Sequence, residues 1–243
     1  MKTETYYIDC GIHLGEGSSI LLSELNLNQD AHIIAFEANQ ITFNELNRVR
    51  ARKDLPDKYK YLQHRNFVIH NKAVWIKSGY KEMSFCLQKI PLNLEKDYYL
   101  EDFMVMHNSK VKSGDLVAPH QNTGKAIDGS STFFGKRNMN YLQSKGNILQ
   151  KNIDFSYKEQ VATINFSSFI LEEIPKNSEI IVKMDIEGAE FRVMNSLISS
   201  GAIKRISKLY IEWHSYDYFL LRLAKIYIKT RLRFFSIQVN DWH

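Results

Sequence analysis

The sequence predicts an α/β protein built on a doubly wound, mostly parallel sheet. Short apolar segments typical of strands alternate with longer segments of helical spacing, which is the pattern of βαβ units. Several strand candidates end in an acidic residue, as expected where ligands meet the carboxyl ends of parallel strands. The chain of 243 residues is 44% hydrophobic and 24% charged, and it is long enough for one large core.

The first 75 residues contain three strand candidates and two helix candidates. The strands are expected at 6–10, 32–36 and 66–75, and the helices at 16–26 and 41–52. In the first helix, Ile20, Leu21 and Leu25 are expected on one face. Residues 78–160 then interrupt the alternation with six of the eleven glycines and long polar runs. We interpret them as a variable, functional insertion or lid between the third and fourth strands.

The alternation resumes after residue 160. Strands are expected at 179–185, 208–213 and 234–239, and helices at 188–200 and about 216–231. The first of these helices has apolar residues on its inward face, and Gly201 is placed to end it. Neither an internal repeat nor a linker divides the chain. We therefore expect a single domain over 1–243, with 78–160 inserted in it.

Composition indicates a reducing compartment, and we expect a cytoplasmic protein. The two cysteines, Cys10 and Cys86, form neither a disulfide framework nor a clustered zinc site. The start of the sequence lacks the apolar segment of a secretion signal, and no stretch reaches the roughly 18 apolar residues of a membrane span.

The formal net charge of +5 is concentrated in the C-terminal part. Residues 201–243 contain eight basic and three acidic residues, whereas residues 1–200 contain 24 of each sign. A protein that binds nucleic acid over its whole surface would be basic throughout. Arg222, Lys225 and Lys229 repeat at helical spacing and form one face. This face is either solvated or in peripheral contact with an anionic partner, such as a membrane surface, an RNA or a nucleotide diphosphate.

A glycine-containing turn joins the first strand to the first helix. Asp9 and Gly11 follow the strand, and Gly15 precedes the helix, whose unpaired N–H groups can bind a ligand. The turn lacks the GxGxxG pattern of NAD-binding proteins, and the acid at Asp9 suits a cationic ligand. Glu37 ends the second strand, where a carboxylate accepts the ribose hydroxyls of an adenosine or simply favours the next helix.

Two further motifs place acidic residues and a histidine after strand candidates. Asp185 ends one strand, while Glu212 and His214 end the next, so these side chains share one rim if the strands are neighbours. Carboxylates and an imidazole there can hold a divalent ion or act as a general base. Glu187 and Glu190 can favour the first turn of the following helix, and for Glu190 we expect only that role.

Together these motifs resemble the FkbM family of S-adenosylmethionine-dependent O-methyltransferases. The resemblance rests on the segments DCGIHLGEGSS, AFEAN, NKAVW, KMDIEGAEFRVM and LYIEWH, in this order, over about 1–77 and 161–215. The fourth segment is the most specific. The family usually has D-x-G-A-N-x-G in the first, so Ile12 and His13 depart from it, while the aspartate and both glycines match.

The resemblance implies a class I methyltransferase fold, which is Rossmann-like, with S-adenosyl-L-methionine across the carboxyl ends of the strands. The segment from Asp9 to Gly15 would support the methionine half of this cofactor, and Glu37 its ribose. The cofactor-binding residues implied in this way are Asp9, Gly11, His13, Gly15, Glu37 and Ala38. The acceptors implied are hydroxyl groups of sugars, nucleotide sugars or glycoconjugates, and surface polysaccharide biosynthesis is the expected pathway.

Methylation of a hydroxyl requires its alignment with the sulfonium and removal of its proton. Either His214 or Asp185 is the general base, or Asp185, Glu212 and His214 hold Mg²⁺ or Mn²⁺, which lowers the pKa of the hydroxyl. The second arrangement is similar to that of metal-dependent catechol O-methyltransferases. We favour the metal because hard oxygen ligands with one imidazole suit these ions.

Three other functions are left open by the sequence. A ribose 2′-O-methyltransferase of RNA would use the same hydroxyl chemistry. An NAD-dependent oxidoreductase would have the same topology, and a non-catalytic binding protein would keep the same fold. Base-methylating enzymes are disfavoured, because no proline lies in a D/N-P-P-Y/F motif and neither cysteine follows a proline. The expected partner is a carbohydrate acceptor, with RNA as an alternative, and the oligomeric state is left open.

Overall fold

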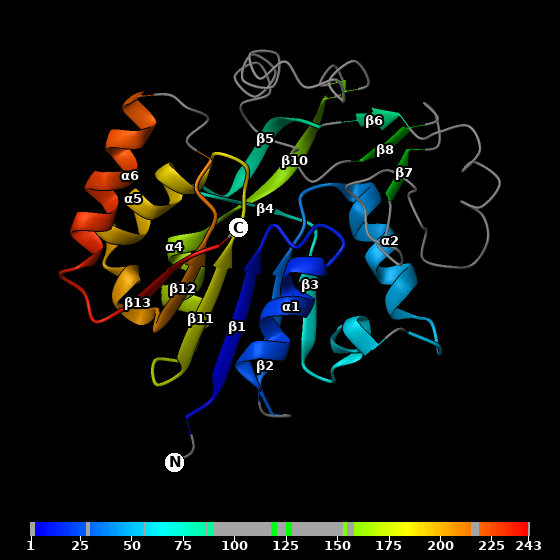
Figure 1. Ribbon diagram of the computed structural model, residues 1–243, viewed down its shortest axis with the longest axis horizontal. Helices are drawn as coiled ribbons and strands as arrows, with labels where there is room; N and C mark the ends of the chain where they lie inside the picture. Colours follow the sequence, from blue (N-terminus) through cyan, green and yellow to red (C-terminus); the bar gives the residue numbers. More distant parts are fainter. Residues whose placement is uncertain are drawn as a thin grey trace.

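The computed structural model describes residues 3–27, 30–55, 57–85, 87–89, 118–120, 125–127, 153–154, 158–214 and 219–242. At its centre is a six-stranded parallel sheet with the order β13-β12-β11-β1-β2-β3 (Figure 1). The strands are β1 (Thr5–Cys10), β2 (His32–Phe36), β3 (Phe67–His70), β11 (Glu179–Met184), β12 (Lys208–Ile211) and β13 (Gln238–Asp241). The predicted doubly wound α/β fold is confirmed, and its strand order reverses between β1 and β11, the place where ligands of such sheets bind.

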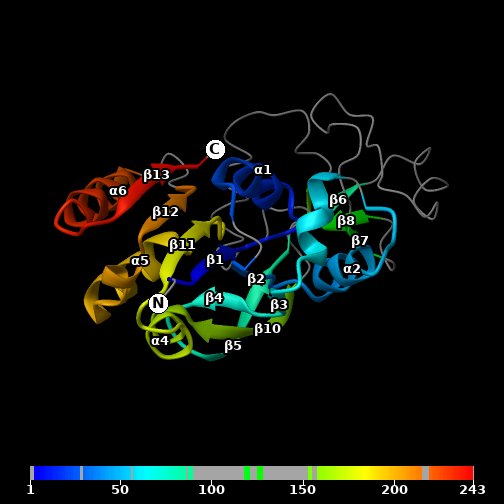
Figure 2. The ribbon, with the colours of Figure 1, turned by 90° about the horizontal axis from the view of Figure 1, so that it is seen from below.

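Helices cover both faces of this sheet. One face carries α1 (Glu16–Leu25), α2 (Gln40–Arg50) and the 3₁₀ helix η1 (Asp57–Gln63). The other carries α4 (Phe166–Ser168), the π-helical turn η5 (Phe169–Glu173), α5 (Glu190–Ser200), the 3₁₀ helix η6 (Ala202–Arg205) and α6 (Phe219–Leu232). Figure 2 shows α1 and α5 on opposite faces of the sheet.

The alternation of side chains along β1 explains the two cores. Tyr6, Ile8 and Cys10 pack in the apolar cluster that contains α5, whereas Tyr7 packs in the cluster that contains α1. Asp9 points to the same face as Tyr7, because successive side chains of a strand alternate. A carboxylate is therefore buried between the sheet and α1.

The predicted helix boundaries agree with the structure to within a few residues. Gly201 ends α5 with φ 78°, as predicted. In α1, Leu21 is completely buried and Leu25 packs against the same cluster, but Ile20 is exposed. The prediction that Ile20 shares their inward face was wrong, because successive helical residues lie about 100° apart and the adjoining buried position is Leu21.

Two smaller sheets lie beside the central one. The first has the order β4-β10-β5, formed by β4 (Ala73–Trp75), β5 (Gly79–Ser84) and β10 (Lys158–Asn165). The second consists of the short strands β6 (Leu87–Lys89), β7 (Ala118–His120), β8 (Lys125–Ile127) and β9 (Ile153–Asp154). Most of the expected insertion at 78–160 lies outside the described residues, so its interpretation as a lid stays a prediction.

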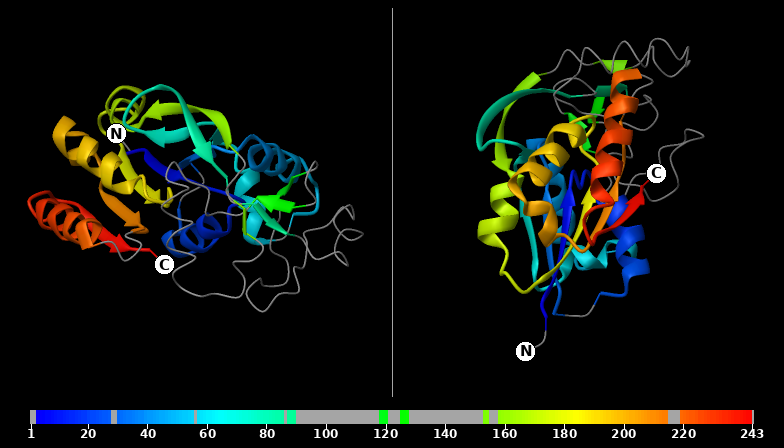
Figure 3. Two further views of the ribbon diagram at one scale, coloured as in Figure 1. Left: turned by 90° about the horizontal axis from the view of Figure 1, so that it is seen from above. Right: turned by 90° about the vertical axis from the view of Figure 1, so that its left-hand side faces the viewer.

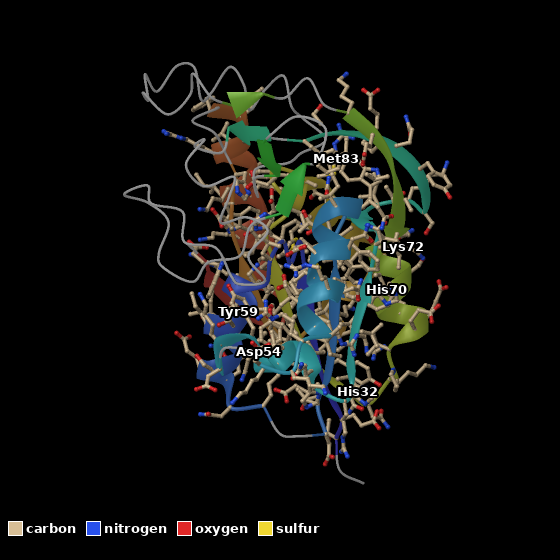
Figure 4. The ribbon with its side chains drawn as sticks, turned by 90° about the vertical axis from the view of Figure 1, so that its right-hand side faces the viewer. His32, Asp54, Tyr59, His70, Lys72 and Met83 are labelled. Atoms are coloured by element: carbon tan, nitrogen blue, oxygen red, sulfur yellow. The ribbon has the colours of Figure 1, made fainter. Side chains whose placement is uncertain are left out.

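The third strand expected at 66–75 is present as β3, but its continuation to residue 75 is wrong, because the chain turns between β3 and β4. The Lys72 N–H donates to the His70 carbonyl at 2.9 Å. The Asn71 amide donates to the carbonyls of Glu37 and Ala38, at 3.0 and 3.3 Å, which ties the turn to the end of β2. Figure 4 shows His70 and Lys72 on either side of this turn. As a result, β4 leaves the central sheet and pairs with β10.

The expected last strand at 234–239 begins later than predicted. Helical hydrogen bonds continue past the end of α6, because the N–H groups of Phe234 and Phe235 donate to the carbonyls of Arg231 and Leu232 at 3.1 and 3.0 Å. Pairing with β12 starts only at Gln238. Among the described helices, none has the length and apolar character required to cross a membrane.

Candidate functional site

The predicted site residues gather at the carboxyl ends of four adjacent strands. Asp9 lies on β1, Glu37 follows β2, Asp185 follows β11, and Glu212 and His214 follow β12. These strands are parallel neighbours, so their ends form one rim at the upper edge of the sheet in Figure 1. The expectation that Asp185, Glu212 and His214 share a rim is confirmed.

Gly11 is required by the close approach of β1 and β11. Its φ is 86°, and a Cβ at this position would lie 2.0 Å from the carbonyl oxygen of Asp185. The Asp185 N–H donates to the Cys10 carbonyl at 3.0 Å, which holds the two strand ends together. No side chain fits in this arrangement.

The turn after Gly11 is bound to the end of β2. The backbone N–H of His13 donates to Glu37 Oε2 at 2.9 Å. His13 has φ 49°, a left-handed conformation in which asparagine and histidine are both enriched, so histidine fits where the family usually has asparagine. Gly15 is also left-handed, and its carbonyl accepts a hydrogen bond from the Tyr61 hydroxyl at 2.7 Å.

Glu37 is buried, with both carboxylate oxygens engaged by backbone donors. Besides the His13 contact at Oε2, Oε1 accepts the N–H of Asn39 at 2.7 Å. Burial raises the pKa of Glu37 to about 7, although the Asn39 and His13 donors oppose the shift. Each carboxylate oxygen has a second lone pair, so the group can still accept ribose hydroxyls. Ala38 follows with its carbonyl bound to Asn71, and its role in cofactor binding stays a prediction.

Asp9 belongs to a buried charge cluster with Lys183 and Ser18. The Ser18 hydroxyl donates to Asp9 Oδ2, and Lys183 Nζ lies 3.4 Å from Oδ1. Burial raises the pKa of Asp9, and Lys183 and Ser18 counteract part of this effect. Asp9 has no exposed surface. The structure thus shows an ion pair for Asp9, and its contact with the methionine half of a cofactor stays a prediction.

Lys183 connects this cluster to the rim. Its Nζ lies 3.7 Å from Asp185 Oδ2 as well as 3.4 Å from Asp9 Oδ1. Burial lowers the pKa of Lys183, but the two carboxylates outweigh it, so the pKa is raised overall. The side chain packs against Gly17, where a Cβ would lie 2.7 Å from Lys183 Cε. The sequence interpretation assigned no role to Lys183, although a lysine inside a buried strand signals a charged partner.

Four carboxylates surround the imidazole of His214. Its Nδ1 lies 2.9 Å from Glu190 Oε1, and its Nε2 lies 3.4 Å from Glu187 Oε2. The same Nε2 lies 3.5 Å from Glu212 Oε1 and 3.9 Å from Asp185 Oδ1. Burial alone lowers the pKa of His214, but hydrogen bonds to Glu187 and Glu190 outweigh it and raise this pKa to about 12.

Glu190 does more than favour the first turn of α5. It is completely buried, and its carboxylate accepts the N–H groups of Ile186 and Gly188 at 2.9–3.1 Å. It also binds His214 and thereby orients the imidazole. The expectation of a helix-start role alone was therefore incomplete.

The donor atoms at this rim suit a divalent ion. One ligand atom each from Asp185, Glu212 and His214 lies within 4.8 Å of the others. Burial, with the Asp185 charge as a second cause, raises the pKa of Glu212 to about 7. Two carboxylates and an imidazole match the ligand preference of Mg²⁺ or Mn²⁺. The two carboxylates therefore fit the predicted ion, whereas His214 would have to lose the proton that its raised pKa retains before it could serve as a ligand.

A doubly wound sheet with a glycine turn after β1, an acid after β2 and an acidic rim across the switch point is the architecture of an α/β protein of the nucleotide-binding type. The family model described as the methyltransferase FkbM domain matches residues 9–229, and the chain belongs to this family. It is therefore a methyltransferase, and the family implies S-adenosylmethionine as methyl donor. No curated protein and no solved structure gave a significant match.

Proposed function

We propose that the protein is an S-adenosylmethionine-dependent O-methyltransferase whose acceptor is a hydroxyl of a sugar, a nucleotide sugar or a glycoconjugate, in surface polysaccharide biosynthesis. The observation that carries the proposal is the close grouping of Asp185, Glu212 and His214 beside the Gly11 turn. This grouping supports hydroxyl chemistry, because a sugar hydroxyl keeps its proton near neutral pH and needs help to lose it.

The reaction is a displacement at carbon. The acceptor oxygen attacks the methyl carbon in line with sulfur, the C–O bond forms as the C–S bond breaks, and the electron pair of the broken bond returns to sulfur. The hydroxyl proton passes to the carboxylate of Asp185, which is partly exposed at the rim. Lys183 stabilises this carboxylate from the buried side.

Glu190 and Glu187 hold the imidazole of His214 at the rim. The residues that would hold Mg²⁺ or Mn²⁺ are Asp185, Glu212 and His214. When bound there, such an ion supplies Lewis acidity that lowers the pKa of the acceptor hydroxyl. On the donor side, the Gly11 turn would hold the methyl donor, and the Glu37 carboxylate would accept its ribose hydroxyls.

Turnover with labelled S-adenosylmethionine tests the proposal. We expect labelling of a nucleotide sugar or free glycan in a panel of acceptors, and loss of labelling in Asp185→Asn but not in the exposed control Asp54→Asn. Treatment with EDTA should abolish transfer, and added Mg²⁺ or Mn²⁺ should restore it. Full activity after EDTA would contradict a requirement for a metal ion and would leave Asp185 as the general base.

The same panel should include RNA. If the ribose of RNA is labelled and no carbohydrate is, the acceptor is RNA and not a carbohydrate. Binding to RNA would then weaken steeply as the salt concentration rises.

A further inference from the structure

The helix α6 carries an apolar face that points away from the core. Its exposed large apolar side chains are 45–75% accessible, and they are Phe219, Leu220, Leu223, Ile226 and Tyr227. Their spacing of three and four residues places them on one side of the helix. On the opposite side Ile228 and Leu232 are buried against the cluster of α5. Phe234, 83% exposed, extends the apolar face beyond the end of the helix.

This face lies at the outer edge of the fold. Figure 1 shows α6 beyond α5 and β13, and the right panel of Figure 3 shows it from the side that faces outward. Large apolar side chains exposed together on one side of a helix signal an interaction site.

The charges around the apolar face have one sign. Residues 219–233 contain five basic residues and no acidic one. Lys225 and Lys229 approach Asp241 of β13, at 4.0 and 2.6 Å from Oδ2, so they lie on the side that faces the sheet. Arg222 lies at the border of the apolar face on one side, and Arg231 borders it on the other, with its guanidinium over the Tyr227 ring at 5.7 Å. An apolar band bordered by arginines is the pattern of helices that lie in the surface of an anionic bilayer.

We propose that α6 docks the protein on an anionic lipid bilayer, with the apolar band among the acyl chains and the arginines at the phosphates. A second copy of the chain fits this surface less well. A twofold contact would bring the same acid-free segment against itself, so like charges would meet. Docking also brings the rim near the lipid surface, because α6 begins five residues after His214 at the same end of the sheet.

Cosedimentation with vesicles tests this proposal. The protein should bind vesicles containing phosphatidylglycerol and phosphatidylcholine, bind phosphatidylcholine alone weakly, and release as salt is raised. Ile226→Glu should weaken binding about tenfold or more, because the side chain no longer enters the acyl region. The matched control is Ile20→Glu, since Ile20 is an isoleucine of similar exposure on another helix, at 54% against 61%. Removing the charges of Arg222 and Arg231 by substitution with glutamine should weaken binding about fivefold each.

Three results would overturn the proposal. They are no binding of the wild type to anionic vesicles, equal effects of Ile226→Glu and Ile20→Glu, and a dimer in sedimentation that Ile226→Glu alone dissociates. Affinity for S-adenosylhomocysteine should be unchanged in all these variants. That readout reports correct folding and separates a failure of membrane docking from a failure of the proposed methyl transfer.

Discussion

The imidazole Nδ1 of His214 lies 2.9 Å from Oε1 of the completely buried Glu190. Because Glu190 is itself fixed by the N–H groups of Ile186 and Gly188, it sets the direction of the ring. The other nitrogen, Nε2, consequently faces Asp185 and Glu212 at the rim.

Glu190→Gln tests this positioning role. We expect a fall in kcat of about 10–100-fold with little change in the KM for S-adenosylmethionine, because the substitution disturbs the ring and not the donor site. Steady-state kinetics with both substrates varied measures the split, and Glu172→Gln on the exposed surface is the control. A rise in KM for the methyl donor with unchanged kcat would contradict the role.

Lys183→Met should be strongly destabilising. It leaves the Asp9 carboxylate buried without its cation, which costs about 3–5 kcal/mol. The matched control is Lys158→Met, whose exposed pair with Glu82 is worth at most about 1 kcal/mol. Urea unfolding measures both. The double variant Lys183→Met with Asp9→Asn should recover part of the loss, and strict additivity would show that the two groups do not interact.

Gly11→Ala and Gly201→Ala compare two left-handed glycines. Both positions have positive φ, but a Cβ at Gly11 meets the Asp185 carbonyl, while one at Gly201 meets nothing within 4 Å. Gly201→Ala should cost about 1–2 kcal/mol from backbone strain alone. Gly11→Ala should cost more and should also abolish binding of S-adenosylhomocysteine in calorimetry. Equal effects of the two substitutions would show that the close approach is unimportant.

The raised pKa of Glu37 predicts a pH-dependent stability. In the folded protein the pKa of Glu37 is about 7, whereas the ordinary pKa of a glutamate, which holds in the unfolded state, is 4.5. The folded state therefore binds more protons between these values, and the stability contribution that is present below about pH 4.5 is lost as pH rises through about 7. Relative to Glu37→Gln, the wild type should lose up to about 3 kcal/mol over this interval. Urea unfolding of both proteins across this range is the measurement, and parallel pH profiles would contradict the shift.

The sequence predicts the residues at the rim better than the buried ion pair of Asp9 and Lys183 beneath them. Asp9, Glu37, Asp185 and His214 could be placed because parallel strands bring their carboxyl ends to one edge. The pair of Lys183 with Asp9 joins residues 174 positions apart, and it depends on the register of β1 against β11, which local patterns do not encode.

Turns and exposed helix faces also depend on contacts between residues distant in the sequence, so local patterns do not predict them. The break between β3 and β4 depends on Asn71 binding carbonyls of a distant strand end, so the apolar pattern of 66–75 could not indicate it. The basic spacing of α6 is present in the sequence, but which side of the helix is exposed depends on its packing against the core and on the contacts of Lys225 and Lys229 with Asp241.

The central claim, that this rim directs methyl transfer to a hydroxyl, is tested most directly by the product. Incubation with S-adenosylmethionine and a labelled carbohydrate acceptor, followed by NMR and mass spectrometry, identifies the atom that receives the methyl group. We predict a new O-methyl ether, lost in Asp185→Asn while that variant still binds S-adenosylhomocysteine as tightly as the wild type. Methylation on nitrogen or carbon, or an undiminished yield of ether from Asp185→Asn, would contradict the claim.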